Sequence, residues 1–201
     1  MDFPDYKKYA GLIFDLDGTL INSMPYHVVA WKKVCAEHGF QINPQLIYDM
    51  GGVSSRDVIV YFKNQGHDVG DIDEFVKRKV ELYRENIDKV ELFPKILAIL
   101  NESIANHKKV AIGSGTQLKN AQDILNIHNL LDSVDAIVTS EMVEKHKPFP
   151  DTFLLCAQKM GLKPQDCVVF EDGPLGVEAA LAGGFDCIEV KDGEFVKLHK
   201  N

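Results

Sequence analysis

Short apolar runs recur along the chain, and they restrict the fold more than any other feature of the sequence. The runs with strand character are GLIFD from Gly11, KVAIG from Lys109, DAIVT from Asp135, CVVFE from Cys167 and CIEV from Cys187. Helical patterns such as PDTFLLCAQKMG and PLGVEAALAGG, each of which opens near a proline and closes at a glycine, lie between the later runs. Continuously apolar strands that alternate with helices are typical of a parallel sheet covered on both faces. The sequence therefore predicts a doubly wound, Rossmann-like α/β core.

The connection after the first run is far longer than an ordinary crossover, because roughly seventy residues separate that run from LFPKILAIL. Two stretches within it have apolar or aromatic residues at helical spacing. These positions are Val28, Trp31, Cys35 and His38 in the first stretch, and Phe75, Val76, Lys79, Val80 and Tyr83 in the second. We expect residues 22–92 to form an all-helical cap domain, and residues 1–21 and 93–201 to form the core.

Composition and charge argue against several classes of protein. The formal net charge of −8 does not suit general electrostatic binding of nucleic acid or of an anionic membrane. The N-terminal MDFPDYKKYA lacks the apolar centre of a signal peptide, and no apolar stretch approaches the ~20 residues that span a bilayer. We therefore expect a cytoplasmic protein. The small size of the cap suggests a monomer or a weak homodimer. Its widely spaced cysteines should be reduced and buried: Cys35, Cys156, Cys167 and Cys187.

Residues able to do chemistry cluster just after the apolar runs. In open α/β sheets, ligands bind beyond the carboxyl ends of the strands, so these residues should share one edge of the sheet. In chain order they are Asp15, Asp17, Ser114, Lys147, Glu171 and Asp172. The sequence thus predicts a site that combines carboxylates with one hydroxyl and one ammonium group.

Asp15 and Asp17 stand one residue apart in GLIFDLDGTL, and burying neighbouring like charges is costly. Asp-Gly between apolar residues is also a hairpin-turn signal, but the chain after Leu20 is polar and then helical, so no partner strand is predicted. A Mg²⁺ ion held by Asp15 and Asp172, with Glu171 nearby, would explain why the carboxylates tolerate one another. Asp17 should point to the same side of the extended chain as Asp15. One carboxyl group could then act as nucleophile and the other as acid and base.

A lysine and a glycine-rich turn offer contacts for an anion at this edge. A lysine such as Lys147 is more often a solvated surface residue, but Pro148 biases it towards an extended conformation, and a fixed cation there would suit a phosphoryl group. The segment GSGT is equally typical of a tight turn, and it lacks the spacing of a dinucleotide or P-loop fingerprint. The Ser114 hydroxyl and neighbouring N–H groups, that of Gly115 included, nevertheless suit a phosphate cradle ahead of a helix.

The segments DLDGT, GSGT, KHKPFPD and FEDGPLG, in this order and spacing, resemble the motifs of the haloacid dehalogenase superfamily of phosphohydrolases. The helical insertion after the first motif is similar to the cap of the β-phosphoglucomutase-like branch. Within that branch, KHKPFPDTFLLCAQKMGLKPQDCVVFEDG looks most like the bacterial fructose-1-phosphate phosphatases. The resemblance implies a Mg²⁺-dependent enzyme that acts on small phosphorylated sugars or sugar acids.

The resemblance also implies a role for each motif residue. Asp15 is the nucleophile that forms an aspartyl-phosphate, and Asp17 protonates the leaving alkoxide and then activates water. Ser114 and Lys147 bind phosphoryl oxygens. The implied Mg²⁺ ligands are Asp15, Asp172, the Asp17 carbonyl and, as an open question, Glu171. These roles agree with phosphoryl transfer as a reaction that depends on positioning and charge neutralisation.

Residues of the expected cap leave a mutase as an alternative to a hydrolase. His27 stands where the related mutases have a histidine, although a helix residue that helps to close the cap fits the position equally well. The mutase pattern has a lysine and an arginine around a GVS turn, where this chain has Gly51 and Ser55. Losing two cations at a site for a dianion is a large electrostatic loss, so we favour hydrolysis. Arg56 could contact a sugar hydroxyl or carboxylate, but an exposed arginine at a helix start is the simpler interpretation.

Two non-enzymatic alternatives are weaker. A receiver module of signalling proteins is also phosphorylated on aspartate, but its aspartate follows a middle strand and it has no helical insertion. A sugar-phosphate sensor that has lost catalysis would be expected to have lost Asp15 or Asp17, and both are present. The function predicted from the sequence is a Mg²⁺-dependent sugar-phosphate phosphatase, and β-phosphoglucomutase is the alternative.

Overall fold

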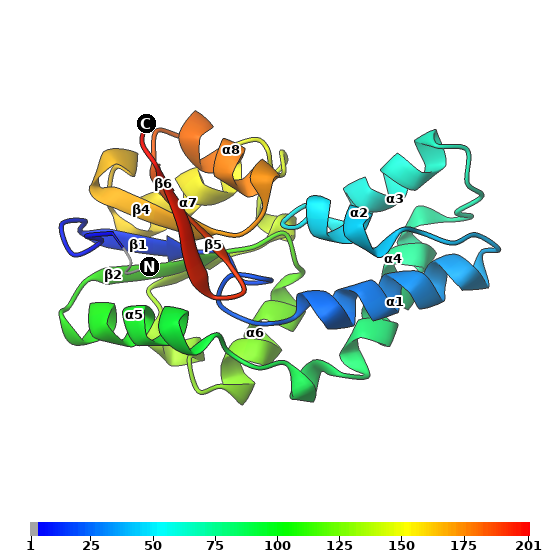
Figure 1. Cartoon of the computed structure of the whole chain (residues 1–201), viewed down its shortest axis with the longest axis horizontal. Coiled ribbons are helices and arrows are strands. Elements are labelled where there is room, and N and C mark those ends of the chain that lie inside the picture. The colour runs from blue at the N-terminus through cyan, green and yellow to red at the C-terminus, as the bar shows by residue number, and fades with distance from the viewer. Residues whose placement is uncertain (1–3) are drawn as a thin grey trace.

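A single six-stranded sheet forms the centre of the protein, which the computed structural model describes over residues 4–201 (Figure 1). The strands lie in the order β3-β2-β1-β4-β5-β6. Their bounds are β1 Gly11–Phe14, β2 Lys109–Gly113, β3 Ala136–Val138, β4 Cys167–Glu171, β5 Asp186–Lys191 and β6 Glu194–His199. The first five strands are parallel, and β1 lies between β2 and β4.

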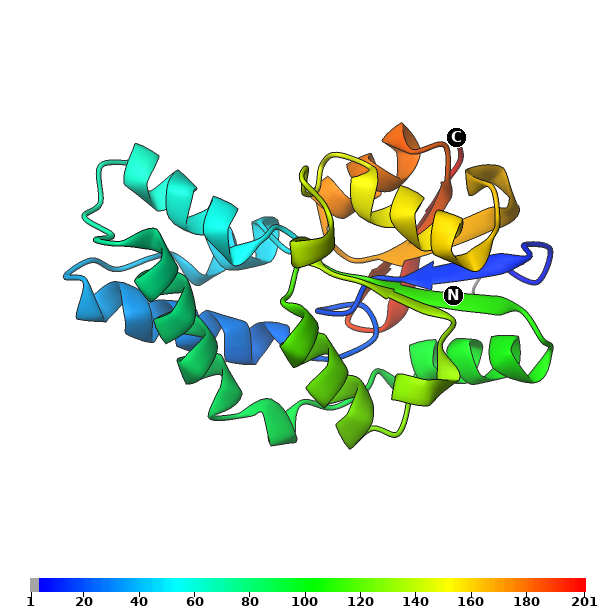
Figure 2. The same ribbon diagram turned by 180° about the vertical axis from the view of Figure 1, so that it is seen from behind.

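Helices cover both faces of the sheet, as the apolar strands require. One face packs against α5 (Pro94–Ala105) and α6 (Leu118–Ile127), and the other packs against α7 (Asp151–Met160) and α8 (Pro174–Ala182) (Figures 1 and 2). Alternate residues of β1 serve the two faces: Leu12 and Phe14 belong to one apolar cluster and Ile13 belongs to the other. The prediction of a doubly wound, parallel α/β core is confirmed.

The sixth strand is absent from the sequence-based prediction. β6 pairs antiparallel with β5 through a turn in which Asp192 and Gly193 have φ values of 51° and 74°. Asp192-Gly193 therefore forms the kind of hairpin turn that an Asp-Gly pair favours, and it does so at the edge of the sheet. At Asp17-Gly18, where the same dipeptide occurs, the chain turns without a partner strand and enters the helical insertion. The prediction missed β6 because its sequence EFVKLH is largely polar and only partly buried.

A helical insertion lies beside the sheet between β1 and α5 (Figures 1 and 2). Its helices are α1 Met24–Glu37, α2 Pro44–Asp49, α3 Ser55–Asn64 and α4 Ile72–Arg84, followed by a short 3-10 turn at Ile87–Lys89. The expected stripes of α1 and α4 are buried except at His38, Val76 and Val80. His38 is exposed because α1 ends at Glu37. The helix start expected at Arg56 is that of α3, whereas α2 is a six-residue helix with one buried residue, Ile47, and was not predicted.

All four cysteines are free and buried, as expected. Over residues 4–201, no helix combines the length and the apolar character that crossing a bilayer demands.

Candidate active site

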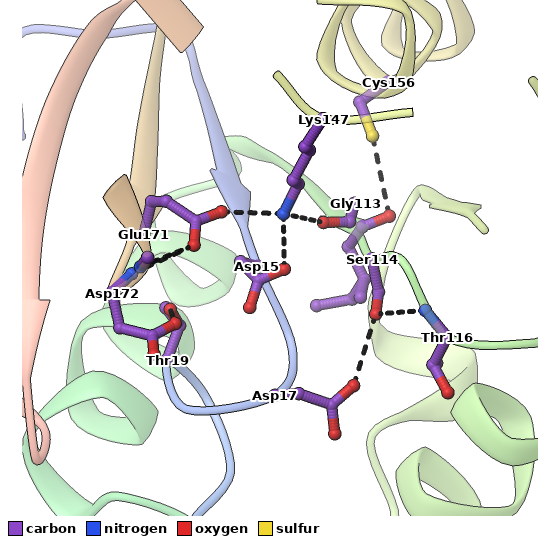
Figure 3. Close-up of polar contacts among 12 residues, drawn as sticks. Asp15, Asp17, Thr19, Gly113, Ser114, Thr116, Lys147, Cys156, Glu171 and Asp172 are labelled. Atoms are coloured by element: carbon purple, nitrogen blue, oxygen red, sulfur yellow. Dashed lines mark hydrogen bonds and ion pairs between the residues drawn. The ribbon is translucent and has the colours of Figure 1, made fainter. Parts of the chain in front are cut away.

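The carboxyl ends of β1, β2 and β4 bring the residues singled out from the sequence into one cluster (Figure 3). Asp15 directly follows β1, and its backbone N–H donates to the Phe170 carbonyl of β4 at 2.9 Å. Glu171 ends β4, and Ser114 follows β2. Because parallel strands end at a common edge, three distant segments of the sequence meet here.

Lys147 is the centre of this cluster. Its Nζ lies 2.6 Å from Asp15 Oδ1, 2.7 Å from Glu171 Oε2 and 3.5 Å from the Gly113 carbonyl oxygen. The residue is only 3% exposed, so the interpretation as a solvated surface lysine is wrong. Burial favours the neutral amine, but the two carboxylates outweigh it and raise the Lys147 pKa above its usual value. The site therefore contains a permanent buried cation.

Three carboxylates, that of Asp15 included, lie close together beside Lys147. Asp15, Glu171 and Asp172 each offer one oxygen within 4.8 Å of the others, and Asp15 Oδ2 is buried without a hydrogen-bond partner. Burial and the charge of Glu171 raise the pKa of Asp15 well above its usual value and that of Asp172 to about 8. An unpartnered buried carboxylate oxygen beside mutually repelling carboxylates fits a hard divalent cation such as Mg²⁺.

Protein groups already occupy both oxygens of Glu171. Oε1 accepts the backbone N–H groups of Asp172 at 3.1 Å and of Gly173 at 3.0 Å, and Oε2 faces Lys147. Thr19 Oγ1 donates to Asp172 Oδ1 at 2.9 Å. The geometry thus favours Asp15 and Asp172 as direct ligands, with Glu171 orienting Lys147 and the backbone that carries Asp172.

Asp17 has a separate set of partners. Its Oδ1 accepts hydrogen bonds from Ser23 Oγ at 2.6 Å and His27 Nε2 at 2.9 Å. Its Oδ2 faces Ser114 Oγ at 3.4 Å (Figure 3). Burial would raise the pKa of Asp17, but the contacts with His27 and Ser23 outweigh it and lower the value to about 2. Asp17 is therefore ionised, and its carboxylate is fixed on three sides.

Sequence reasoning missed Lys79, which it treated only as part of an apolar stripe. Lys79 is 5% exposed, and its Nζ donates to His27 Nδ1 at 2.9 Å. A protonated Lys79 can only donate, so Nδ1 then accepts this bond and Nε2–H points at Asp17. Burial and the charge of Lys79 lower the pKa of His27 below its usual value, which favours this neutral ring. The ring also stacks on Tyr83 with centroids 4.0 Å apart. A lysine in the buried stripe of an amphipathic helix was the available signal, since lysine is almost never buried without a reason.

The loop Gly51–Val53 of the helical insertion lies directly over the cluster. A Cβ atom at Gly115 would overlap the Gly52 carbonyl oxygen, and one at Gly173 would lie 2.9 Å from the Gly51 carbonyl oxygen. A Cβ atom at Gly52 would lie 3.2 Å from Lys147 Nζ. The absence of side chains at these positions therefore allows backbone to approach backbone. Ser114 Oγ accepts a hydrogen bond from the Thr116 N–H at 3.0 Å. This bond fixes the loop that follows β2, which lies under the loop Gly51–Val53.

A small cavity of about 50 Å³ lies beneath the loop. Asp17, His27, Gly52, Gly115 and Lys79 are among its lining residues. Within residues 4–201, Lys79 is the one lysine or arginine in this lining.

Arg56 is exposed and pairs with Asp73, in agreement with the simpler interpretation of an arginine at a helix start. It lines an outer cavity of about 250 Å³ that adjoins the inner cavity beside Asp17, and Lys79 and Gly115 line both.

Comparison with known proteins identifies the family. A sequence profile described as haloacid dehalogenase-like hydrolase matches residues 12–190. The chain belongs to the haloacid dehalogenase-like hydrolases. It is 36% identical to fructose-1-phosphate phosphatase YqaB of Escherichia coli strain K12, over 92% of this chain and 98% of that protein. It is also 31% identical to hexitol phosphatase A of the same organism, over 90% of this chain and 82% of that protein.

The fold comparison agrees with the sequence comparison. The crystal structure of β-phosphoglucomutase from Clostridium difficile superimposes with a TM-score of 0.82 at 25% identity, covering 90% of this chain and 84% of that chain. Among haloacid dehalogenase-like hydrolases, the chain is thus similar both to phosphatases and to a mutase. The family resemblance read from the sequence motifs is confirmed, as is the prediction of a phosphatase-class enzyme.

Proposed function

We propose that this protein is a Mg²⁺-dependent phosphatase of small phosphorylated sugars or sugar acids, in which residues 22–92 form a cap over the active site. The observation that carries the proposal is the pairing of Lys147 with Asp15 beside the acidic cluster, directly under the loop Gly51–Val53. Lys147 supplies charge for phosphoryl oxygens, and Asp15 presents a carboxylate to phosphorus.

Asp15 is the nucleophile in this proposal. A carboxylate oxygen of Asp15 forms a bond to phosphorus while the bond from phosphorus to the sugar oxygen breaks, and the leaving oxygen takes a proton from Asp17. A water oxygen then forms a bond to phosphorus while the bond from phosphorus to the Asp15 oxygen breaks. Asp17 takes the proton of that water, the Asp15 carboxylate is restored and inorganic phosphate leaves. Ser114, the Gly115 N–H and Lys147 bind the phosphoryl oxygens during both steps.

Asp15 and Asp172, with the backbone carbonyl of Asp17, would hold Mg²⁺, which when bound supplies further neutralisation of phosphoryl charge. The unpartnered Asp15 Oδ2 supports this assignment. The partners on both oxygens of Glu171 support an orienting role for that residue.

Asp17 must carry a proton to serve as the acid, although its pKa in the ligand-free site is about 2. A phosphate dianion beside Asp17 favours the protonated carboxyl group, because like charges in a buried site repel. His27 and Ser23 hold the carboxylate in place, and Lys79 fixes the tautomer of His27. The proton can thus be loaded when substrate binds.

The lining of the inner cavity supports hydrolysis of the substrate over transfer of its phosphate to another position on the sugar. A mutase must hold a second phosphate in the cap, where Gly51 and Ser55 provide no charge. Lys79, the one cation in the described lining of the inner cavity, already contacts His27. Arg56 is paired with Asp73 at the outer cavity. The names of the relatives, a fructose-1-phosphate phosphatase and a hexitol phosphatase, support phosphorylated sugars and polyols as the substrate class.

The test is phosphate release with Mg²⁺ from fructose 1-phosphate, 6-phosphogluconate, glucose 6-phosphate and β-glucose 1-phosphate, with the Asp15→Asn variant as control. We expect release by the wild type and none above background by Asp15→Asn. Conversion of β-glucose 1-phosphate to glucose 6-phosphate without release would identify a mutase instead. Absence of both reactions would reject the proposal for this class of substrate.

A further inference from the structure

His146 makes a direct contact between the helical insertion and the sheet domain. Its Nδ1 lies 2.7 Å from Asp57 Oδ2 in the first turn of α3, and its Nε2 lies 3.1 Å from the Ser140 carbonyl oxygen. His146 immediately precedes Lys147 in the chain. The phosphate-binding role assigned to Lys147 does not use this histidine.

Asp57 is rigidly connected to the loop that covers the site. The Ser54 hydroxyl donates to Asp57 Oδ2 at 2.6 Å, and the Asp57 N–H donates back to Ser54 Oγ at 3.2 Å. Ser54 is the N-cap of α3 and directly follows the loop Gly51–Val53. A contact that holds Asp57 therefore also holds that loop.

The other side of His146 leads to the loop that carries Ser114. Both the N–H and the hydroxyl of Ser140 donate to the Thr116 carbonyl oxygen, at 3.2 Å and 3.1 Å. The N–H of Thr116 donates to Ser114 Oγ. His146 thus joins the insertion to both loops that would bind phosphate.

Both ring nitrogens of His146 face oxygens that accept hydrogen bonds, a carboxylate and a carbonyl. When each nitrogen carries a proton, both contacts form together as hydrogen bonds and the contact with Asp57 is an ion pair. The His146 side chain is 20% exposed and the Asp57 side chain is 46% exposed, so water reaches the pair mainly from the Asp57 side.

We propose that His146 is a positioning residue that holds the cap closed over the phosphate site through its ion pair with Asp57. The proposal rests on the proposed function, because closure matters only if substrate binds beneath the cap. The ion pair stabilises the closed form, so substrate binding need not supply all of the free energy of closure.

Loss of the ion pair should therefore raise KM more than it lowers kcat. For His146→Ala we expect KM for the best sugar phosphate to rise about three- to tenfold, with kcat within about twofold of the wild type. Asp57→Asn should have a similar effect, and the double variant should be little worse than either single one. His146→Asn, which keeps one donor towards Asp57, should recover part of the loss.

A matched control is available in the same chain. His199 Nε2 pairs with Glu189 Oε2 at 2.6 Å, and the His199 side chain is also 20% exposed, but both residues lie on the β5–β6 hairpin. His199→Ala removes a comparable ion pair without loosening the cap. Its KM should equal that of the wild type.

Hydrogen–deuterium exchange gives a readout that does not depend on turnover. With Mg²⁺ and inorganic phosphate present, amides in residues 50–57 should exchange faster in His146→Ala than in the wild type or in His199→Ala. Unchanged exchange there, additive effects of His146→Ala and Asp57→Asn, or a fall in kcat with KM unchanged would overturn the proposal. The last result would mean that His146 only positions Lys147. If the wild type releases no phosphate from any sugar phosphate, the proposed function fails, while the exchange measurement still decides whether His146 closes the cap.

Discussion

Lys79 should make the protein less stable near neutral pH than at higher pH, because its ammonium group is buried and its hydrogen-bond partner is a neutral imidazole rather than a carboxylate. Burial lowers its pKa from 10.5 to about 8, with the charge of Asp17 acting in the opposite direction. At pH 7 this difference corresponds to an electrostatic cost of about 3 kcal/mol for the folded state. Contacts with the Trp31 and Tyr83 rings, at 5.1 Å and 5.5 Å, and the hydrogen bond to His27 offset part of that cost.

Lys79→Met removes the charge while keeping a side chain of similar length. Below pH 8 the folded wild type keeps Lys79 protonated at a cost. Between pH 8 and pH 10.5 the folded amine loses its proton while the unfolded one keeps it, so the cost is relieved as the pH rises. The free energy of unfolding of the wild type, relative to Lys79→Met, should therefore rise by about 2 kcal/mol from pH 7 to pH 10.

Urea unfolding at several pH values from 7 to 10 measures this difference directly. Lys77→Met, on the exposed face of the same helix, is the control and should follow the wild type. Parallel profiles for the wild type and Lys79→Met would show that Lys79 does not carry a strained charge, and the reasoning would be wrong. Lys79→Met should also lower activity, independently of its effect on stability. Without Lys79 the His27 ring loses the partner that fixes it, so kcat should fall about ten- to a hundredfold.

Three further changes test other parts of the site. Gly115→Ala places a methyl group against the Gly52 carbonyl oxygen, so cap closure should be hindered and KM should rise about tenfold with unfolding unchanged, as steady-state kinetics and urea titration would show. Asp172→Ala should raise the Mg²⁺ concentration for half-maximal activity at least about tenfold, and an unshifted Mg²⁺ titration would remove Asp172 from the ligand set. Mg²⁺ at a hundredfold excess over its Kd should raise the free energy of unfolding of the wild type by about 2.7 kcal/mol, which a thermal melt records as a higher melting temperature. EDTA should reverse this increase, and Asp172→Ala should show a smaller one.

The motif residues were identifiable from sequence because each follows an apolar run whose strand character is local. Parallel strands end at one edge, so the order of these runs was enough to predict that Asp15, Lys147 and Glu171 share that edge, although not that they are in contact. Arg56 was also interpreted correctly as an exposed helix-start residue. The same local reasoning missed β6, whose largely polar sequence becomes a strand only because β5 offers it an edge.

Sequence by itself determined the α/β core, the place of the insertion and the residue types of the candidate site, because apolar periodicity and motif spacing are short-range properties of the chain. Tertiary structure alone decided that Lys147 is buried between Asp15 and Glu171, that Lys79 reaches His27, and that His146 contacts Asp57. Each of these contacts joins residues far apart in the chain. Their geometry depends on how the insertion packs against the sheet, and no local pattern encodes that packing.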